Sequence, residues 1–287
     1  MSKKIKKAFS LIELSIVILI IGILVAGVTQ SSRLMKSMRL MTARNLTLSS
    51  PVNSIQNLVM WYETTLEKSI DEAERQDGIE VSKWYDITPT SITKNDATQT
   101  VLASRPKYTD GVINGLPVLK FDGSSDFFDI DGKLFVGSQY TIFVVEQRRT
   151  NADAFFFGGG SFGTNMCLIA GYYTGGASLR HAHFGDDVND CLNCVPLYST
   201  VIPRIHIFRF SYSKGKQYYL NGSTVTSQNA TVNPLVSYNN AYIAKYGTSI
   251  FYYGDIAEII VFSSALNVEE LSSIKDYLSK KWGIKVN

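Results

Sequence analysis

Cysteine and histidine are scarce in this sequence, with 3 of each in 287 residues. So few cysteines, in an odd number, exclude a fold built on a dense disulfide framework. The chain also lacks Gly-x-Ser-x-Gly, His-Glu-x-x-His and a phosphate-binding loop. No predicted strand carries the two carboxylates that a retaining glycosidase places about 5 Å apart. The sequence therefore predicts a protein that is not an enzyme.

Basic residues are not in excess over most of the chain. Residues 1–8 carry four lysines, and residues 9–50 carry four basic residues and one acid, out of totals of 28 and 25. Residues 51–287 therefore hold 20 basic and 24 acidic side chains, a formal charge of −4. A protein that follows a phosphate backbone needs a basic face, so we expect no nucleic-acid binding by this part of the chain.

One long apolar segment lies near the N-terminus. In residues 9–28, Glu13 is the only ionisable side chain. A helix of about 20 residues is about 30 Å long, which matches the hydrocarbon core of a bilayer. The apolar core of a secretory signal is shorter, about 7 to 15 residues, and a lone carboxylate there costs about 2.5 to 3.5 kcal/mol on insertion. We expect this segment to span a membrane and Glu13 to have a partner.

A short motif surrounds the start of the apolar segment, where residues 6–14 read Lys-Lys-Ala-Phe-Ser-Leu-Ile-Glu-Leu. This motif resembles the leader and cleavage site of type IV prepilins and pseudopilins, although the family usually has Gly where this sequence has Ala8. The resemblance implies a leader at residues 1–8, cleavage between Ala8 and Phe9, N-methylation of Phe9, and a role for Glu13 in filament assembly. The new terminal ammonium of a neighbouring subunit would neutralise Glu13.

The same resemblance implies partners and a location. The partners are a prepilin peptidase, other pilin or pseudopilin subunits and the bacterial inner membrane. One N-terminal helix would hold the chain there, with its head outside the cytoplasm, at the cell surface or in the periplasm once assembled. The large head favours a minor or tip subunit of a type IV pilus or type II secretion filament. A membrane-anchored carbohydrate-binding module that does not enter filaments is the alternative.

The helical pattern continues beyond the apolar segment. Leu34, Met38 and Met41 recur at helical spacing, and no proline occurs before Pro51. We therefore predict a transmembrane helix and stem within residues 9–50.

After residue 50 the composition changes to β-branched and aromatic residues separated by Gly, Asn and Asp. Many short strands without long intervening helices predict an antiparallel β-sandwich. Asn267 and Glu270 have the spacing of a capping box, which predicts a short C-terminal helix. The predicted fold class is mainly β, a long transmembrane helix followed by this sandwich. Strands are expected at residues 140–146, 205–213, 217–220 and 256–262.

The order of several segments resembles the concanavalin A-like, laminin-G-type jelly roll. They include Asn57–Tyr62, Trp84–Asp86, Phe121–Gly123, Tyr219–Gly222 and Ile256–Phe262. The resemblance implies that residues 51–287 form one jelly-roll head, and it makes a surface glycan a candidate partner.

Two acidic clusters are candidates for ligand or calcium binding, because carboxylates and amides bind both calcium and sugar hydroxyls. One contains Asp122, Asp126, Asp129 and Asp131, and Asp122 is expected to form a turn. The other is a predicted loop, which makes it the better candidate for ligand contact. It contains Asp186, Asp187, Asn189 and Asp190. No cofactor is otherwise expected.

The cysteines leave three alternatives open. Outside the cytoplasm, two of Cys167, Cys191 and Cys194 would form a disulfide and leave one thiol over, which is the favoured interpretation. His181 and His183 alternate on a predicted strand and face the same way, so with two cysteines they form a candidate zinc site. Free thiols are the third alternative.

Overall fold

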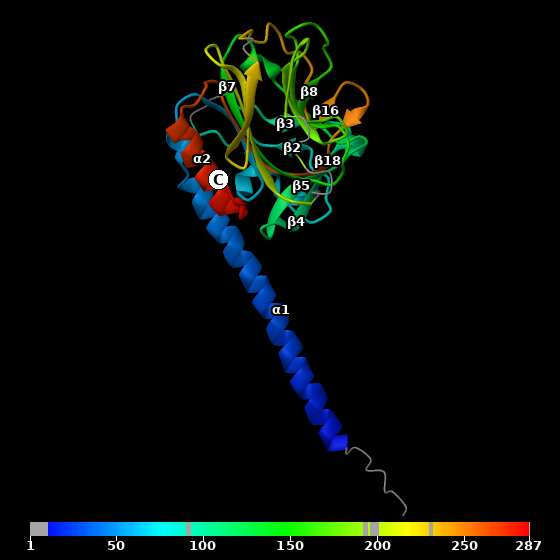
Figure 1. Ribbon diagram of the computed structural model, residues 1–287. Helices are drawn as coiled ribbons and strands as arrows, with labels where there is room; N and C mark the ends of the chain where they lie inside the picture. The colour runs from blue at the N-terminus through cyan, green and yellow to red at the C-terminus, as the bar shows by residue number, and fades with distance from the viewer. Residues whose placement is uncertain (1–10, 90–92, 192–194, 196–200, 230–231, 287) are drawn as a thin grey trace, which may run out of the picture.

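The structure is a computed structural model that describes residues 11–89, 93–191, 195, 201–229 and 232–286. Its first element is one long helix, α1 (Leu11–Leu48), which projects from a β-rich head (Figure 1). The helix ends shortly before Pro51, because proline lacks the N–H that a helix interior needs. The prediction of a helix that continues well beyond the apolar segment is confirmed.

Two antiparallel sheets form the head. Strands β14-β13-β12-β7-β18-β5-β4 follow one another in the first sheet, and β1 also pairs with β18. Their bounds are β14 (Ser223–Asn229), β13 (Gly215–Leu220), β12 (Arg204–Ser211), β7 (Tyr140–Arg148), β18 (Tyr253–Phe262), β5 (Leu116–Asp122), β4 (Lys107–Ile113) and β1 (Leu58–Glu63).

The second sheet has the order β11-β10-β9-β8-β15-β6-β3-β2. Its strands are β11 (Asp186–Cys191), β10 (Ser178–His183), β9 (Leu168–Tyr173), β8 (Ala154–Gly159), β15 (Ala241–Ile243), β6 (Phe128–Ile130), β3 (Ala97–Thr98) and β2 (Lys83–Trp84). A ribbon of β16 (Lys245–Tyr246) and β17 (Ile250–Phe251) adjoins it, and short 3₁₀ helices lie at Pro51–Ser54, Glu67–Ser69, Glu72–Glu74, Leu102–Ser104 and Gly132–Phe135. The predicted β-sandwich is confirmed.

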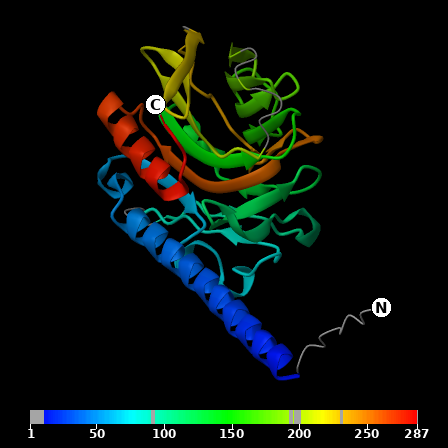
Figure 2. The ribbon, with the colours of Figure 1, turned by 60° about the horizontal axis from the view of Figure 1, so that its bottom comes forward.

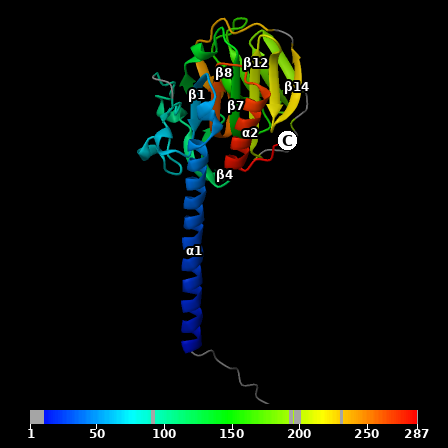
Figure 3. The ribbon, with the colours of Figure 1, turned by 90° about the vertical axis from the view of Figure 1, so that its left-hand side faces the viewer.

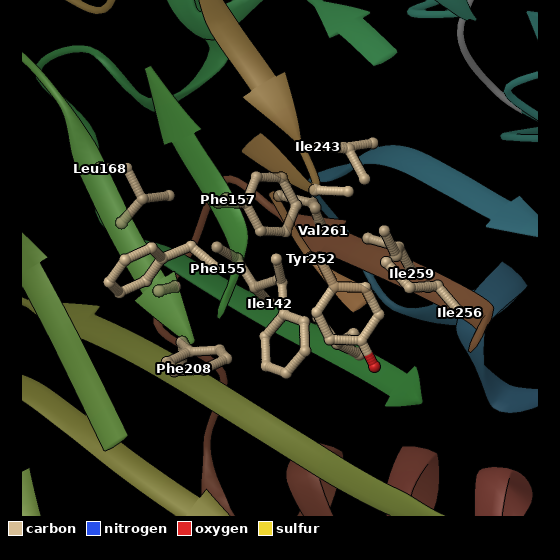
Figure 4. Close-up of a cluster of buried hydrophobic side chains, with 14 of the residues drawn as sticks. Ile142, Phe155, Phe157, Leu168, Phe208, Ile243, Tyr252, Ile256, Ile259 and Val261 are labelled. Carbon is tan, nitrogen blue, oxygen red and sulfur yellow. The ribbon is translucent and has the colours of Figure 1, made fainter. Parts of the chain in front are cut away.

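The main core lies between the two sheets, where aromatic and branched side chains pack together (Figure 4). On β7, Ile142 and Val144 point into this core, whereas Phe143 and Val145 point to the opposite face. Because side chains alternate along a strand, a nearly continuous apolar sequence indicates a strand that is buried on both faces. The outer face of the first sheet must therefore be covered.

Helix α2 (Val268–Trp282) supplies that cover, and the last turns of α1 lie beside it (Figures 2 and 3). The predicted capping box is confirmed, since the Asn267 side chain accepts from Glu270 N and the Glu270 side chain accepts from Asn267 N. Gly283 ends the helix in the left-handed conformation, at φ 66°. Leu278 and Trp282 are buried against the sheet.

Candidate functional site

The membrane-facing candidate is α1. Its apolar residues from Leu11 to Val28 are exposed, with 84% of Leu11 and 69% of Val28 accessible, because the helix extends away from the head (Figure 1). By length and composition α1 is able to cross a membrane. Glu13 lies in its first turn and is exposed in the single chain. Ala8 and Phe9 lie outside the described residues, so the cleavage site stays a prediction. This uncovered surface requires lipid or other subunits around it.

The C-terminal part of α1 is fastened to the head. Ala43 and Thr47 are buried, and the Thr47 hydroxyl lies 3.2 Å from the Tyr277 hydroxyl on α2. Arg44 donates from Nε to the Thr65 carbonyl at 2.8 Å and pairs with Glu67 at 2.8 Å. The last turns of α1 are therefore packed against the head.

Behind this joint lies a buried ionic cluster. Glu63 on β1 and Glu258 on β18 stand opposite each other in the sheet, and Lys281 Nζ lies 2.9 Å from an oxygen of each carboxylate. Burial alone would raise the pKa of Glu63, but Lys281 and the hydroxyls of Ser69 and Thr65 lower it to about 2. The cluster is sealed from solvent, so its geometry stabilises the fold and offers no access to a substrate.

The sequence analysis did not identify this cluster. Each of its members is a charged residue within an apolar strand or on the apolar face of a helix, and that signal is visible in the sequence. Glu63 and Glu258 are 195 positions apart along the chain. Only the fold brings them together.

A second buried cluster lies between the sheets. Glu146 accepts from Tyr172 at 2.7 Å and from Tyr252 at 2.5 Å, and His206 Nε2 is 2.8 Å from the same carboxylate. Burial raises the pKa of Glu146, and the bonds from His206 and Tyr252 more than offset that effect and lower it. All four side chains are fully buried. A carboxylate beside a histidine is a common catalytic pair, but here no ligand can reach it without opening the sandwich.

His181 and His183 face the same way, as predicted. Both Nε2 atoms contact the Tyr140 hydroxyl, at 2.8 and 2.9 Å, inside the core. Burial lowers the pKa of His183 to about 3, so its ring is neutral. Of the cysteines, Cys167 is buried, Cys191 lies in β11 with its side chain outside the described set, and Cys194 lies outside the described residues. In the described part of the chain no three His, Cys, Asp or Glu side chains converge to hold a metal.

The predicted loop at residues 186–190 is not a loop. These residues form β11, which pairs with β10 in antiparallel register, for example Asp187 with Ala182. Pairing with a neighbouring strand outweighs the low intrinsic β-propensity of Asp and Asn. Asp186 is 3.0 Å from Lys216 Nζ on β13, and the side chains of Asp187, Asn189 and Asp190 are outside the described set. The role of this segment in ligand binding stays a prediction.

The first acidic cluster is divided in the fold, since Asp122 and Asp126 stay in contact at the end of β5, whereas Asp129 lies on β6. Asp122 accepts hydrogen bonds from the backbone N–H groups of Ser124, Ser125 and Asp126, so the predicted turn is confirmed. Burial raises the pKa of Asp122, but these bonds, with the Ser124 hydroxyl, outweigh it and hold the pKa well below its usual range. Asp131 instead caps a 3₁₀ helix by accepting from Lys133 N.

Comparison with known proteins supports the predictions made for the N-terminal segment and for the fold of the head. Residues 3–29 match a family model described as the prokaryotic N-terminal methylation motif. The chain therefore carries a prepilin-type N-terminal segment, as its sequence indicated. This motif implies processing by a prepilin peptidase and assembly with other pilins in general, which favours a structural, pilin-like subunit. It is also compatible with membrane anchoring. No curated protein matches the chain as a whole.

Among solved structures, the head is similar to β-sandwich domains. The binding domain of Paraclostridial Mosquitocidal Protein 1 has a TM-score of 0.55 at 13% identity, over 81% of this chain and 56% of that one. A complex of Trypanosoma rangeli sialidase with 2,3-difluoro-KDN has a TM-score of 0.50 at 13% identity, over 86% and 39%. This chain thus spans about half or less of these longer proteins. The likeness shows the β-sandwich fold.

Proposed function

We propose that the protein is a minor or tip subunit of a type IV pilus or a type II secretion filament. In this proposal prepilin peptidase cuts between Ala8 and Phe9, and the mature chain waits in the inner membrane with its head outside the cytoplasm. The head then binds a surface glycan or another envelope component and does not turn it over.

The observation that carries the proposal is the uncovered apolar helix behind the methylation motif. Residues 3–29 match the motif, and α1 keeps the apolar part of that segment free of contact with its own head. Such a helix can exchange lipid for the helices of neighbouring subunits without unfolding the head. Glu13 would then find the terminal ammonium of a neighbour as its counter-charge.

The size of the head supports a minor position. Residues 51–287 amount to 237 residues, a bulk that is difficult to repeat at each step along a thin filament. The clusters at Glu63 and Glu146 are sealed, which favours a binding head over an enzyme. The sandwich likeness is consistent with ligand binding, although fold alone does not specify function.

Mass measurement tests the first part. The full chain is expressed with and without a prepilin peptidase, and its mass is determined. A mature chain that begins at Phe9 supports the filament subunit, whereas an intact leader supports the alternative, a carbohydrate-binding module held by a plain anchor. A Phe9→Ala variant with the peptidase separates specific cleavage from general proteolysis.

Glycan binding tests the second part. The full chain, in a detergent without a sugar headgroup, is screened on a glycan array with calcium and with a chelator. Binding without turnover supports the proposed head function, and binding that needs calcium would revive the calcium alternative. Release of sugar from the array would support an enzyme instead.

A further inference from the structure

Two depressions lie on the head near the point where β5 ends and β18 begins. Asp122 and Tyr253 are paired residues of these strands, and a depression of about 400 Å³ lies on one side of Asp122 and another of about 410 Å³ on the other side. Small-molecule sites usually occupy about 300 to 1,000 Å³. β5 starts at the turn that touches Arg39 of the stem and runs for 7 residues. Its far end is therefore about 20 Å from that turn.

The first depression is lined by cationic side chains whose hydrogen-bond donors are not all engaged by the protein. It is lined by Glu80, Arg105, Lys107, Lys120 and Asp126, beside Asp122 and the exposed Leu102. Lys107 pairs with Glu80 at 3.3 Å. Lys120 Nζ, in contrast, has no hydrogen bond or ion pair with any described residue, although its charge acts on Asp255, the residue paired with it on β18. Arg105 uses only Nε and Nη2, on backbone carbonyls. One ammonium and part of one guanidinium thus face the depression.

Asp126 is the buried polar group of this depression. The residue is only 6% exposed, and its Oδ2 accepts from Asp122 N at 3.0 Å. Its Oδ1 has no hydrogen-bond partner in the described part of the chain and stays accessible to solvent, and the residue lines the depression. An accessible carboxyl oxygen without a protein partner can exchange water for a hydroxyl of a ligand.

The second depression adds an aromatic surface and hydroxyls. It is lined by Thr150, Asp153, Ser249, Phe251 and Tyr253, and Tyr253 is 38% exposed. Gly123, at φ +75°, leaves the room that Tyr253 needs, because a Cβ there would lie 2.6 Å from the Tyr253 Cβ. An exposed aromatic face beside hydroxyl and carboxylate groups suits a sugar ring, which has an apolar face and a polar rim.

We propose that these two depressions form one binding groove for a saccharide that carries a carboxylate, such as a uronic acid unit. The sugar carboxylate lies against Lys120 and Arg105, a hydroxyl meets Asp126, and the next ring stacks on Tyr253. This inference rests on the proposed binding function of the head and moves its site from β11 to the β5–β18 edge.

The groove has a pH dependence of its own. Burial and the charge of Asp122 raise the pKa of Asp126 to about 7, although Asp122 N and Lys107 act in the opposite direction. The charged groups around it are Asp122 at the end of β5, Lys107 on β4, Lys120 on β5, and Glu80 and Arg105 in the flanking segments. At pH 6 the Asp126 carboxyl is mostly neutral and can donate to the sugar. At pH 8 it is ionised and repels an anionic ligand, so binding weakens.

The test uses the full chain in a detergent without a sugar headgroup, with tri-galacturonate and neutral galactotriose as probes. Affinities are measured by isothermal titration calorimetry at pH 6 and pH 8. We expect tri-galacturonate to bind at least tenfold more tightly than galactotriose and more tightly at pH 6. Lys120→Ala and Tyr253→Ala should each weaken binding about tenfold or more, the loss of one good contact. Asp126→Asn should bind equally at both pH values.

Two control variants locate the site. Lys214→Ala removes an exposed lysine from the β12–β13 turn, and Asp187→Ala alters β11. Both should bind like the wild type, and circular dichroism confirms that each variant is folded. Wild-type affinity in Lys120→Ala and Tyr253→Ala, or a loss confined to Asp187→Ala, overturns the groove while leaving a binding head intact. Equal affinity for both probes overturns the acidic ligand class. If the wild type binds no saccharide here or on the array, the groove and the binding role of the head both fail, and the cleavage test still stands.

Discussion

The hydroxyl groups of Thr47 and Tyr277 lie 3.2 Å apart, inside the protein, although the residues are 230 positions apart in the chain. Thr47 belongs to the stem helix and Tyr277 to the last helix of the head. Tyr277 also donates to Glu258 at 2.7 Å, so the joint between stem and head is continuous with the buried ionic cluster. Tyr277 therefore connects the stem to the central strand β18.

Truncation should show how much the joint contributes. We expect fragments 38–287 and 51–287 both to fold as soluble, β-rich monomers, but the shorter one to melt at a lower temperature. It lacks the buried Ala43 and Thr47 and leaves the face of α2 around Tyr277 exposed. The loss of about 2 kcal/mol of burial would lower Tm by about 4 to 8 °C. Thermal melts followed by circular dichroism measure this, and equal Tm values would show that the joint does not stabilise the head.

Lys281→Met should destabilise the head strongly. It leaves Glu63 and Glu258 as buried carboxylates without their cation, a change that costs about 3 to 5 kcal/mol for a buried pair. Lys280→Met, at the exposed neighbouring position, is the matched control and should leave the unfolding free energy almost unchanged. Urea denaturation at pH 7 distinguishes them. A similar denaturation midpoint for both variants would mean that the cluster does not stabilise the fold.

The same cluster should shape the acid stability of the wild type. The folded-state pKa of Glu63, about 2, lies below its ordinary value of 4.5, so its contribution is fully present above pH 4.5. That contribution is lost as the pH falls from about 4.5 to about 2. Lys281→Met removes the cation that lowers the pKa, so its stability should fall less steeply over this interval. If the stability of the two proteins fell equally with pH over this interval, the lowered pKa of Glu63 would be contradicted.

The titration of Asp126 should change the stability with pH in the direction opposite to that of Glu63. Its folded-state pKa of about 7 is above its ordinary value of 3.8, so the associated stability is present below pH 3.8 and is lost as the pH rises through 7. Asp126→Asn keeps an acceptor for Asp122 N and cannot ionise. We expect the variant to gain stability relative to the wild type as the pH rises from 5 to 8, measured by thermal melts without ligand. A difference that does not change with pH would refute the raised pKa.

Glu13→Ala should separate insertion from assembly. It removes an intramembrane charge, which makes insertion easier by about 2.5 kcal/mol, yet it leaves the terminal ammonium of a neighbour without its counter-charge, a loss of up to about 5 kcal/mol. We expect a processed, membrane-inserted protein that is absent from sheared filaments. Ser15→Ala, two positions along the same helix, is the control and should assemble normally. Equal amounts of Glu13→Ala and wild type in the sheared fraction would exclude the pairing.

Much of the fold followed from local sequence. The stem helix has an apolar composition and no proline before Pro51, and the C-terminal helix has its cap at Asn267, so both could be predicted from short stretches. The strand at β7 was visible because β-branched and aromatic residues follow one another there. The prepilin motif is likewise contained in consecutive residues. Helix formation and capping depend on residues close together in the chain, which is why these features could be predicted from the sequence.

The prediction failed where distant segments decide the outcome. Residues 186–190 have the composition of a loop, but they pair with β10 and form strand β11. The convergence of Glu63, Glu258 and Lys281 depends on strand register and on where α2 packs. The groove beside Asp126 could not be predicted from the sequence either, because β4, β5, β18 and their flanking turns all contribute to it.

By itself the sequence determined the prepilin-type segment, the single long helix and a β-rich head, because composition, periodicity and capping act over a few residues. The tertiary structure alone decided which charges are buried in pairs, which acidic segment becomes a strand, and where a carboxylate borders open space. Those properties depend on burial and on the distance between groups far apart in the chain, and neither quantity exists until the two sheets have closed over their core.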